Sequence, residues 1–479
     1  MISKENVLKK LFSFSIGTWI ASLISFVSVP LTTRLINPDD FGKATMFSTV
    51  YLILLFISLV GTPQSFLRFF PEKPEDEKST LLWSSISVPI LISLAISIIV
   101  FIFKSSINIF LVGNPNSYVY LIIIVTLMTG IFQTFSLNVL RAKQRGSIFS
   151  FIQIVQSLCN VSIILLYSIF INRDFYAILY SQLFSNIIAL ITGVYFEKFY
   201  WLKFKIKKQM IIEAIKYGYP FIFSGIFWWI LDWSDRLILR LYVSFYEIGL
   251  YSAAFKIISL ISLFTVGFNT FWYSFAYEQY EKNPENKLIF KKAFDYVSLV
   301  LFCIGFTLLT IKNIIFFLLA ESYQKAAEVS PFLILNPLMI TLAVVVARGI
   351  DFSQKTYFFI LSNMIAAMFN LIGNLLLVPE LGIKGSALST GFSSIILFFT
   401  EFIISERLYP IGYNLKKIYI LLGLFVFSAL LHTFIDNIFL SILSSVFGFF
   451  VTIFLYKKEF TIIYFTVINF LNYIQKKER

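Results

Sequence analysis

The chain alternates between apolar runs of about 20 residues and short polar segments. A helix that crosses a bilayer needs about 20 consecutive apolar residues. On that spacing the sequence predicts fourteen spans, with a lysine-rich segment at residues 198–216 after the sixth. The predicted spans are Leu11–Thr33, Ala44–Leu67, Ser79–Phe103, Tyr118–Leu140, Gly146–Asn172, Phe175–Phe196, Tyr217–Leu239, Ile248–Tyr273, Phe294–Phe317, Val329–Ala347, Thr356–Val378, Gly385–Ser405, Ile418–Ile435 and Asn437–Tyr456.

Composition supports an all-α integral membrane protein. Apolar residues make up 58% of the 479 positions and charged residues only 14%, against about 25% charged in an average soluble domain. This excludes a soluble enzyme and a disordered chain, and two cysteines exclude a disulfide scaffold. With Cys159, Cys303 and His432 far apart, no metal site and no cofactor are expected.

Basic residues predict the orientation, because lysine and arginine collect in cytoplasmic loops. With the N-terminus inside, 29 of the 39 basic residues fall in cytoplasmic segments, eight fall outside, and Arg236 and Lys256 lie within spans. Both termini are therefore predicted to be cytoplasmic in a bacterial inner membrane. The net charge of +13 then reflects topology and attraction to anionic lipids, and nucleic acid is not an expected partner. We interpret the first apolar run as a retained span and residues 460–474 as an interfacial helix.

The two halves of the chain resemble each other at an offset of about 206–210 residues. Arg34 and Gly42 match Arg240 and Gly249 in order and spacing. Each half holds six spans, so the halves would share one orientation and form a cavity where they meet. The predicted organisation is an N-lobe at 1–197, a cytoplasmic linker at 198–216, a C-lobe at 217–406, and two further spans with a tail at 407–479.

Charged residues inside spans are costly and call for an explanation. Asp232, Asp235, Arg236 and Lys256 could be neutralised pairs that lock spans seven and eight together, with the acids alternatively serving ion coupling. They could instead belong to a cationic cavity wall, since an arginine can grip phosphate oxygens with two N–H groups. Arg34 would then face Arg236 across the junction. The basic residues that close spans on the cytoplasmic side are interpreted as a cytoplasmic entrance: Arg68, Arg141 and Arg348. Arg68 and Arg240, which lie near span ends, could instead be snorkelling side chains.

Uncharged polar residues inside the predicted spans could likewise have either a structural role or a role in lining a cavity. Asn370 and Asn374 lie one helical turn apart and could hydrogen-bond between helices or line a sugar-sized polar cavity. No phosphate-binding glycine loop and no paired carboxylates of a glycosyl-transfer site appear in the sequence. The chain is therefore not expected to be an enzyme.

Several motifs together resemble the Wzx-type polysaccharide flippases, whose superfamily also holds lipid II flippases and multidrug exporters. Residues 34–42 read RLINPDDFG, which resembles the family signature R-L-x-x-P-x-(D/E)-(F/Y)-G. Residues 216–220 read KYGYP, residues 234–239 read SDRLIL, and residues 249–253 read GLYSA. Residues 381–387 read LGIKGSA, in which Ser386 stands where family members often have alanine. The match follows the family order over most of the chain.

This resemblance implies two six-helix lobes arranged as a V, with two further C-terminal helices. It implies that the protein flips oligosaccharides linked to polyprenyl pyrophosphate across the bacterial inner membrane by alternating access, for surface polysaccharides such as O-antigen (lipopolysaccharide) or capsule. Arg34, Arg236 and Lys256 would line its cavity. Membrane lipids, a glycan polymerase and chain-length machinery are the implied partners of a monomer. The alternatives are a cation-coupled multidrug exporter of the same superfamily, or a membrane glycan polymerase or glycosyltransferase.

Overall fold

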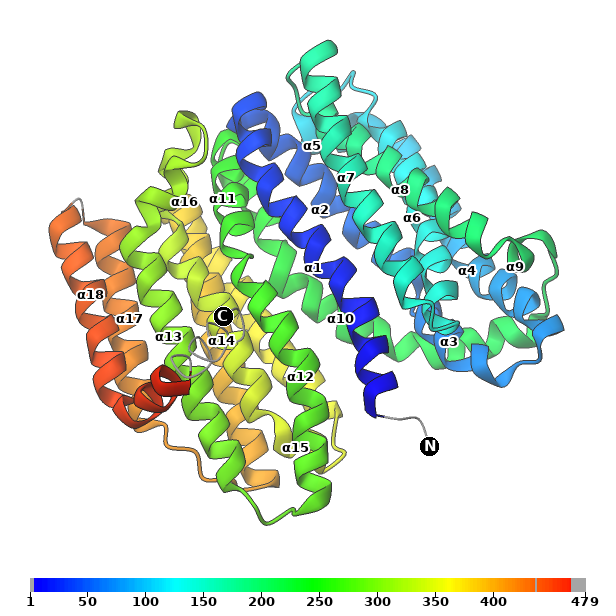
Figure 1. Ribbon diagram of the computed structural model, residues 1–479. Coiled ribbons are helices and arrows are strands. Elements are labelled where there is room, and N and C mark those ends of the chain that lie inside the picture. The colour runs from blue at the N-terminus through cyan, green and yellow to red at the C-terminus, as the bar shows by residue number, and fades with distance from the viewer. Residues whose placement is uncertain (1–3, 436, 467–479) are drawn as a thin grey trace, which may run out of the picture. The chain divides into compact units, whose positions relative to one another are not determined.

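The computed structural model describes residues 4–435 and 437–466, and this part of the chain is helical without any strand (Figure 1). Eleven of the described helices are long and apolar enough to cross a membrane. The prediction of an all-α, multi-pass membrane protein is therefore confirmed. The count of fourteen spans stays a prediction. Every predicted span overlaps described helix, but the second is interrupted at Val60 and Gly61 and the eighth at Ser259 and Leu260.

The chain divides into two compact units, and the first comprises the residues up to 263 together with 319–323. Its long helices are those of the first seven predicted spans. The described elements are α1 (Lys4–Leu35), α2 (Pro38–Leu59), α3 (Thr62–Phe69), η1 (Phe70–Glu72), α4 (Glu75–Ile102), α5 (Lys104–Val112), α6 (Val119–Ala142), α7 (Gly146–Phe170), α8 (Tyr176–Phe196), α9 (Lys198–Leu202), α10 (Lys208–Tyr242) and α11 (Phe245–Ile258).

The second unit comprises residues 264–318 and the residues from 324 onward. Its elements are most of α12 (Ile261–Lys282), α13 (Leu288–Phe317), most of η2 (Glu321–Glu328), α14 (Ser330–Val346), α15 (Arg348–Phe352), α16 (Tyr357–Leu408), α17 (Lys416–Phe434) and α18 (Ile438–Leu455). The predicted limits of lobes and linker stay a prediction, as does their arrangement in a V. Residues 457–466 continue as helix, and the rest of the predicted interfacial tail lies outside the described residues.

Two predicted spans form the element α16, which consists of two helices that meet at a kink at Gly382. This residue has φ 57° and ψ −134°, a conformation that a side chain would strain. Pro379, three residues earlier, lacks the N–H that would continue the helix ladder. The turn expected between spans eleven and twelve is therefore a sharp kink.

The predicted eighth span is divided where α11 ends and α12 begins, at Ser259 and Leu260. The Ser259 hydroxyl donates to the carbonyl of Lys256 at 2.7 Å. A side chain bonded in this way competes with the helix for its carbonyl acceptors. Because α11 ends at Ile258, Lys256 lies in its last turn.

The helices α2 and α11 begin alike and pack against each other within the first unit. Asn37 caps α2, and Ser244, 207 positions later, caps α11 through a reciprocal bond with Glu247. A Cβ added to Gly42 would lie 1.9 Å from the carbonyl oxygen of Phe245, and one added to Gly249 would lie 1.9 Å from that of Pro38. Each glycine thus meets the repeat-related carbonyl of the other helix. This symmetrical contact is what the internal repeat predicts for equivalent helices.

Candidate functional site

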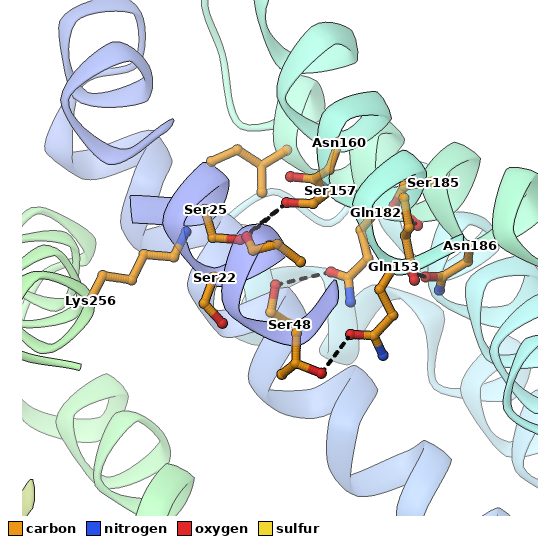
Figure 2. A pocket seen from close by; sticks show the side chains of 14 residues that line it. Ser22, Ser25, Ser48, Gln153, Ser157, Asn160, Gln182, Ser185, Asn186 and Lys256 are labelled. Carbon is orange, nitrogen blue, oxygen red and sulfur yellow. Dashed lines mark hydrogen bonds between the residues drawn. The ribbon is translucent and has the colours of Figure 1, made fainter. Parts of the chain in front are cut away.

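A polar cavity of about 430 Å³ lies within the first unit, between α1, α2, α7 and α8, with one residue from α11 (Figure 2). Among the residues that the structure describes, its lining combines hydroxyls and carboxamides with a single charged side chain, that of Lys256. Figure 2 shows Lys256 reaching toward the serines from one side, while the amide side chains lie on the other. The lining residues are Thr18, Ala21, Ser22, Ser25, Ser48, Gln153, Gln156, Ser157, Asn160, Ile178, Gln182, Ser185, Asn186 and Lys256.

Helical periodicity explains why these side chains share one cavity. Residues three, four and seven positions apart lie on the same helix face. On α7 the polar positions are Gln153, Gln156, Ser157 and Asn160. The positions 18, 22 and 25 of α1 and 182, 185 and 186 of α8 follow the same rule. Three otherwise apolar helices therefore turn their polar faces toward one space.

Hydrogen bonds between the walls use only part of their polar groups. The Gln156 amide donates to Asn186 at 3.1 Å, and Asn186 donates to the Tyr51 hydroxyl at 3.1 Å. Between α1 and α7, the Ser157 hydroxyl donates to the Ala21 carbonyl at 3.0 Å, whereas the Thr18 hydroxyl lies 3.5 Å from Gln153 Oε1. The wall thus keeps hydrogen-bonding capacity for a polar ligand.

A second cavity of about 150 Å³ adjoins the first and shares Ser48, Ile178 and Lys256 with it. Its lining adds the guanidinium-bearing Arg236 and several aromatic rings. The remaining lining residues are Phe41, Ala44, Thr45, Trp233, Ser252 and Phe255. The two cavities therefore meet at Lys256 of α11, and the smaller one adds Arg236 of α10.

Arg236 is only 3% exposed and is held by an acid and by aromatic rings. Its Nη1 pairs with Asp235 Oδ1 at 2.9 Å and also donates to the carbonyl of Asp232. The guanidinium carbon lies 4.3 Å from the centre of the Phe255 ring, within cation–π range. Asp235, itself 1% exposed, accepts a further hydrogen bond from Tyr251. Arg236 is thus fixed in place, and its Nε has no partner among the described residues.

Lys256 has an exposed side chain that faces both cavities. Among the described residues its ammonium has no carboxylate partner, and it lies 5.3 Å from the centre of the Phe41 ring. An unpaired cation at the end of a polar cavity is suited to an anionic ligand. Asp232, one turn before Arg236, is partly exposed and does not line either cavity.

The other basic residues predicted in the first unit lie away from the two cavities. Arg34, in the last turn of α1, is exposed and lines neither of them. Arg68 is half exposed and pairs with Glu72, and the exposed Arg141 lies 4.7 Å from the Phe149 ring centre. Arg240 donates to the Phe110 carbonyl at 2.8 Å. The structure therefore brings together Arg236 and Lys256 and leaves Arg34 apart from them.

The remaining predicted residues belong to the second unit and are fully buried. Arg348 pairs with Asp351 at 2.8 Å and lies 4.3 Å from the ring centre of Tyr273. Asn374 donates to Asn370 within α16, and Asn370 lies 3.4 Å from the hydroxyls of Thr390 and Ser393 beyond the kink. These asparagines therefore join the two halves of α16.

The polar stripes of α1, α7 and α8 are the part of the site that the sequence predictions missed. The signal was present, since Gln153, Gln156, Ser157 and Asn160 recur at helical spacing within an apolar span. Gln182 and Asn186 repeat it one helix later. The predicted site was based mainly on charged residues, because burying a charge in a membrane costs more free energy than burying an amide or a hydroxyl.

Comparison with known proteins places the chain in a family. The profile of the family described as "Polysaccharide biosynthesis protein" matches residues 7–273, more than half of the chain. The chain belongs to this family. The succinoglycan biosynthesis transport protein ExoT of Rhizobium meliloti is 23% identical over 240 residues, which span 50% of this chain and 47% of that protein. An uncharacterized membrane protein of Methanocaldococcus jannaschii is 22% identical over 89% of each chain.

Solved structures share the fold at low identity. The inward-closed lipid II flippase MurJ superposes with a TM-score of 0.70 at 17% identity, over 95% of this chain and 99% of that one. An inward-facing multidrug transporter of the MATE family, in the MOP superfamily, gives a TM-score of 0.55 at 14% identity, over 83% and 93%. The fold of this chain is thus shared with the MurJ and MATE structures.

Proposed function

We propose that this protein flips oligosaccharides linked to polyprenyl pyrophosphate across the bacterial cytoplasmic membrane, from the inner to the outer face. The observation that supports this most is the cavity lined with hydroxyls and amides, which meets the smaller cavity of Arg236 at Lys256. The family match and the likeness to a lipid II flippase and to a succinoglycan transport protein support the same class. The proposal places both termini in the cytoplasm.

The cavity fits the two parts of such a head group. A sugar cannot enter hydrocarbon unaided, because its hydroxyls would lose their water without replacement. Amide and hydroxyl side chains replace those hydrogen bonds. The pyrophosphate would lie against the unpaired ammonium of Lys256 and the guanidinium of Arg236, since charge-assisted hydrogen bonds are the stronger kind.

Transport then proceeds by alternating access. The head group enters from the cytoplasm, the prenyl chain remains in lipid, and rearrangement of the helices exposes the cavity to the other side. A membrane potential that is negative inside favours outward movement of each negative charge by about 2.3 kcal/mol per 100 mV.

The two basic residues provide the test, in liposomes that contain the purified protein and a prenyl-pyrophosphate-linked disaccharide. A hydrogen bond to a charged group is worth about 1.5–3 kcal/mol, so Lys256→Gln and Arg236→Gln should each slow flipping about tenfold or more. Arg236→Lys should recover part of the rate, because it keeps the charge without the forked geometry. Flipping is measured as protection of the sugar from an impermeant oxidant added outside.

Arg173→Gln is the matched control, since Arg173 is exposed in the segment between α7 and α8. It should flip at the wild-type rate. Lys256→Gln is the decisive variant, because it leaves no buried acid unpaired and so should fold normally. Wild-type flipping by both glutamine variants would overturn the proposal.

A drug exporter is the second candidate for this superfamily, and the site does not favour it. An exporter of cationic compounds would be served by carboxylates, and no acidic residue lines either described cavity. The glycan polymerase or glycosyltransferase alternative would need reacting acid–base groups in the same space, and the lining offers amides and hydroxyls instead.

A further inference from the structure

The geometry points to a subsite for uncharged sugar in the larger cavity, which would select lipid-linked glycans whose first residues carry no carboxylate. This inference rests on the proposed function and narrows its substrate class. It concerns the wall formed by Gln153, Asn160 and Gln182, whereas the proposed function concerns the two cations.

The amides of the wall have donors and acceptors to spare. Gln153 and Gln182 use Oε1 to accept from Thr18 and Ser48, at 3.5 and 3.2 Å, and neither Nε2 has a partner among the described residues. Asn160 donates to Ser181 at 3.1 Å, which leaves its carbonyl oxygen facing the cavity. Such groups match sugar hydroxyls and acetamido groups, which both donate and accept.

The lining is also unsuited to a second negative charge. Lys256 is the one charged residue that the described part of the chain contributes to the 430 Å³ cavity, and the adjoining cavity adds Arg236, already paired with Asp235. A pyrophosphate diester brings two negative charges, and these already exceed the one unpaired positive charge of Lys256, because Arg236 shares its charge with Asp235. A uronate on the attached sugar would enter a wall of neutral amides and lose hydration without gaining a counterion.

The positions of the two cavities place the sugar against this wall. They share Ser48 and Lys256, so a pyrophosphate at the cations has its sugar in the larger cavity. The first sugar is bonded directly to the pyrophosphate, which means that the wall meets the proximal sugars and not the distal ones.

Helix packing alone is a weaker explanation for these residues. Polar side chains that join membrane helices normally spend their groups on each other. Here Ser157 and Asn160 do bond to neighbouring helices, at 3.0 and 3.1 Å, but the Nε2 groups of Gln153 and Gln182 have no partner among the described residues. A tight polar seam would also leave no room for a cavity of this size.

Three ligands test the inference on the purified full-length protein in detergent, by microscale thermophoresis. They are a short prenyl pyrophosphate bearing glucosyl-N-acetylglucosamine, the same ligand with its N-acetylglucosamine replaced by glucuronate, and sugar-free prenyl pyrophosphate. The neutral ligand should bind about tenfold or more tightly than either of the others. Equal affinity for the neutral and uronate ligands would overturn the subsite.

Variants of the wall locate the effect. Gln153→Leu combined with Gln182→Leu should reduce affinity for the neutral ligand about tenfold and leave that for the sugar-free ligand unchanged. Gln153→Lys should raise affinity for the uronate ligand, because it supplies a counterion. Gln209→Leu is the matched control, since Gln209 is exposed at the start of α10 and donates to Glu213.

The outcomes separate the two claims. If the leucine variant binds the neutral ligand as the wild type does, the subsite is wrong while the proposed function stands. If Lys256→Gln leaves the affinity for sugar-free prenyl pyrophosphate unchanged, the cation site fails, and with it the proposed function on which this inference depends.

Discussion

At the scale of single residues, the site depends on how Arg236 is held. A buried arginine is stable only when its charge is paired and its N–H groups are bonded. Asp235 pairs with it, and Tyr251 donates to the other carboxylate oxygen. Asp235 thus fixes the guanidinium of Arg236 in the wall of the smaller cavity. The sequence left open whether these charges form neutralised pairs or a cavity wall, and Arg236 does both.

Removing the acid should therefore destabilise the protein. Asp235→Asn leaves Arg236 buried without its counterion, which is expected to cost about 3 kcal/mol or more. Tyr251→Phe removes only a hydrogen-bond donor and should cost about 1–2 kcal/mol. Thermal unfolding in detergent, followed by tryptophan fluorescence, measures both changes.

The surface pair of Asp39 and Lys43 provides the control. Asp39 is 46% exposed, and exposed pairs contribute about 1 kcal/mol or less. If Asp235→Asn lowers the melting temperature no more than Asp39→Asn does, the buried pair does not have the stabilising role assigned to it.

At the scale of elements, the contact between α2 and α11 positions Lys256. Gly42 and Gly249 let the first turns of the two helices meet through their backbones. Lys256, two turns further along α11, is thereby placed against Phe41 of α2. Capping residues at both helix starts fix where each helix begins.

A methyl group at either glycine should force the helices apart. The 1.9 Å between the new Cβ and a carbonyl oxygen is far below any allowed contact, and the opposing atom is backbone, which cannot rotate away. Gly42→Ala and Gly249→Ala should each cost about 1–3 kcal/mol, the usual effect of overpacking. They should also slow flipping, because Lys256 is displaced.

Gly423→Ala in α17 is the matched control, since a Cβ there would meet nothing within 4 Å. Alanine favours helix over glycine by about 1 kcal/mol, so this variant should be neutral or slightly more stable. An unchanged melting temperature for Gly42→Ala would contradict the close approach.

Some features of the structure could be predicted from the sequence pattern and others could not. Apolar runs predicted the helices, because length alone decides whether a segment can cross a bilayer. The division of the eighth predicted span at Ser259 was not visible, since its residues are as apolar as their neighbours. The charged residues inside predicted spans pointed to Arg236 and Lys256. The sequence did not show that Arg34 lines neither of the two cavities. Gln153 and Gln182 line the same cavity because of the way α7 and α8 pack against each other. The residue pattern of one helix does not predict how it packs against another.

At the scale of the whole molecule, the distribution of charge determines orientation. The segment between α8 and α10 holds Lys198, Lys203, Lys205 and Lys207. The segment between α5 and α6 carries no charge. Positive residues remain on the cytoplasmic side during insertion, so these two segments should lie on opposite faces.

Cysteine labelling tests that orientation, in a background in which Cys159 and Cys303 are replaced by alanine. Lys205→Cys and Asn114→Cys introduce thiols at exposed positions of the two segments. An impermeant maleimide added to whole cells should label Asn114→Cys nearly completely and Lys205→Cys hardly at all, whereas both should react after the membrane is permeabilised. The permeabilised sample controls for thiol reactivity. Labelling of Lys205→Cys in intact cells would contradict the predicted orientation, in which both termini lie in the cytoplasm.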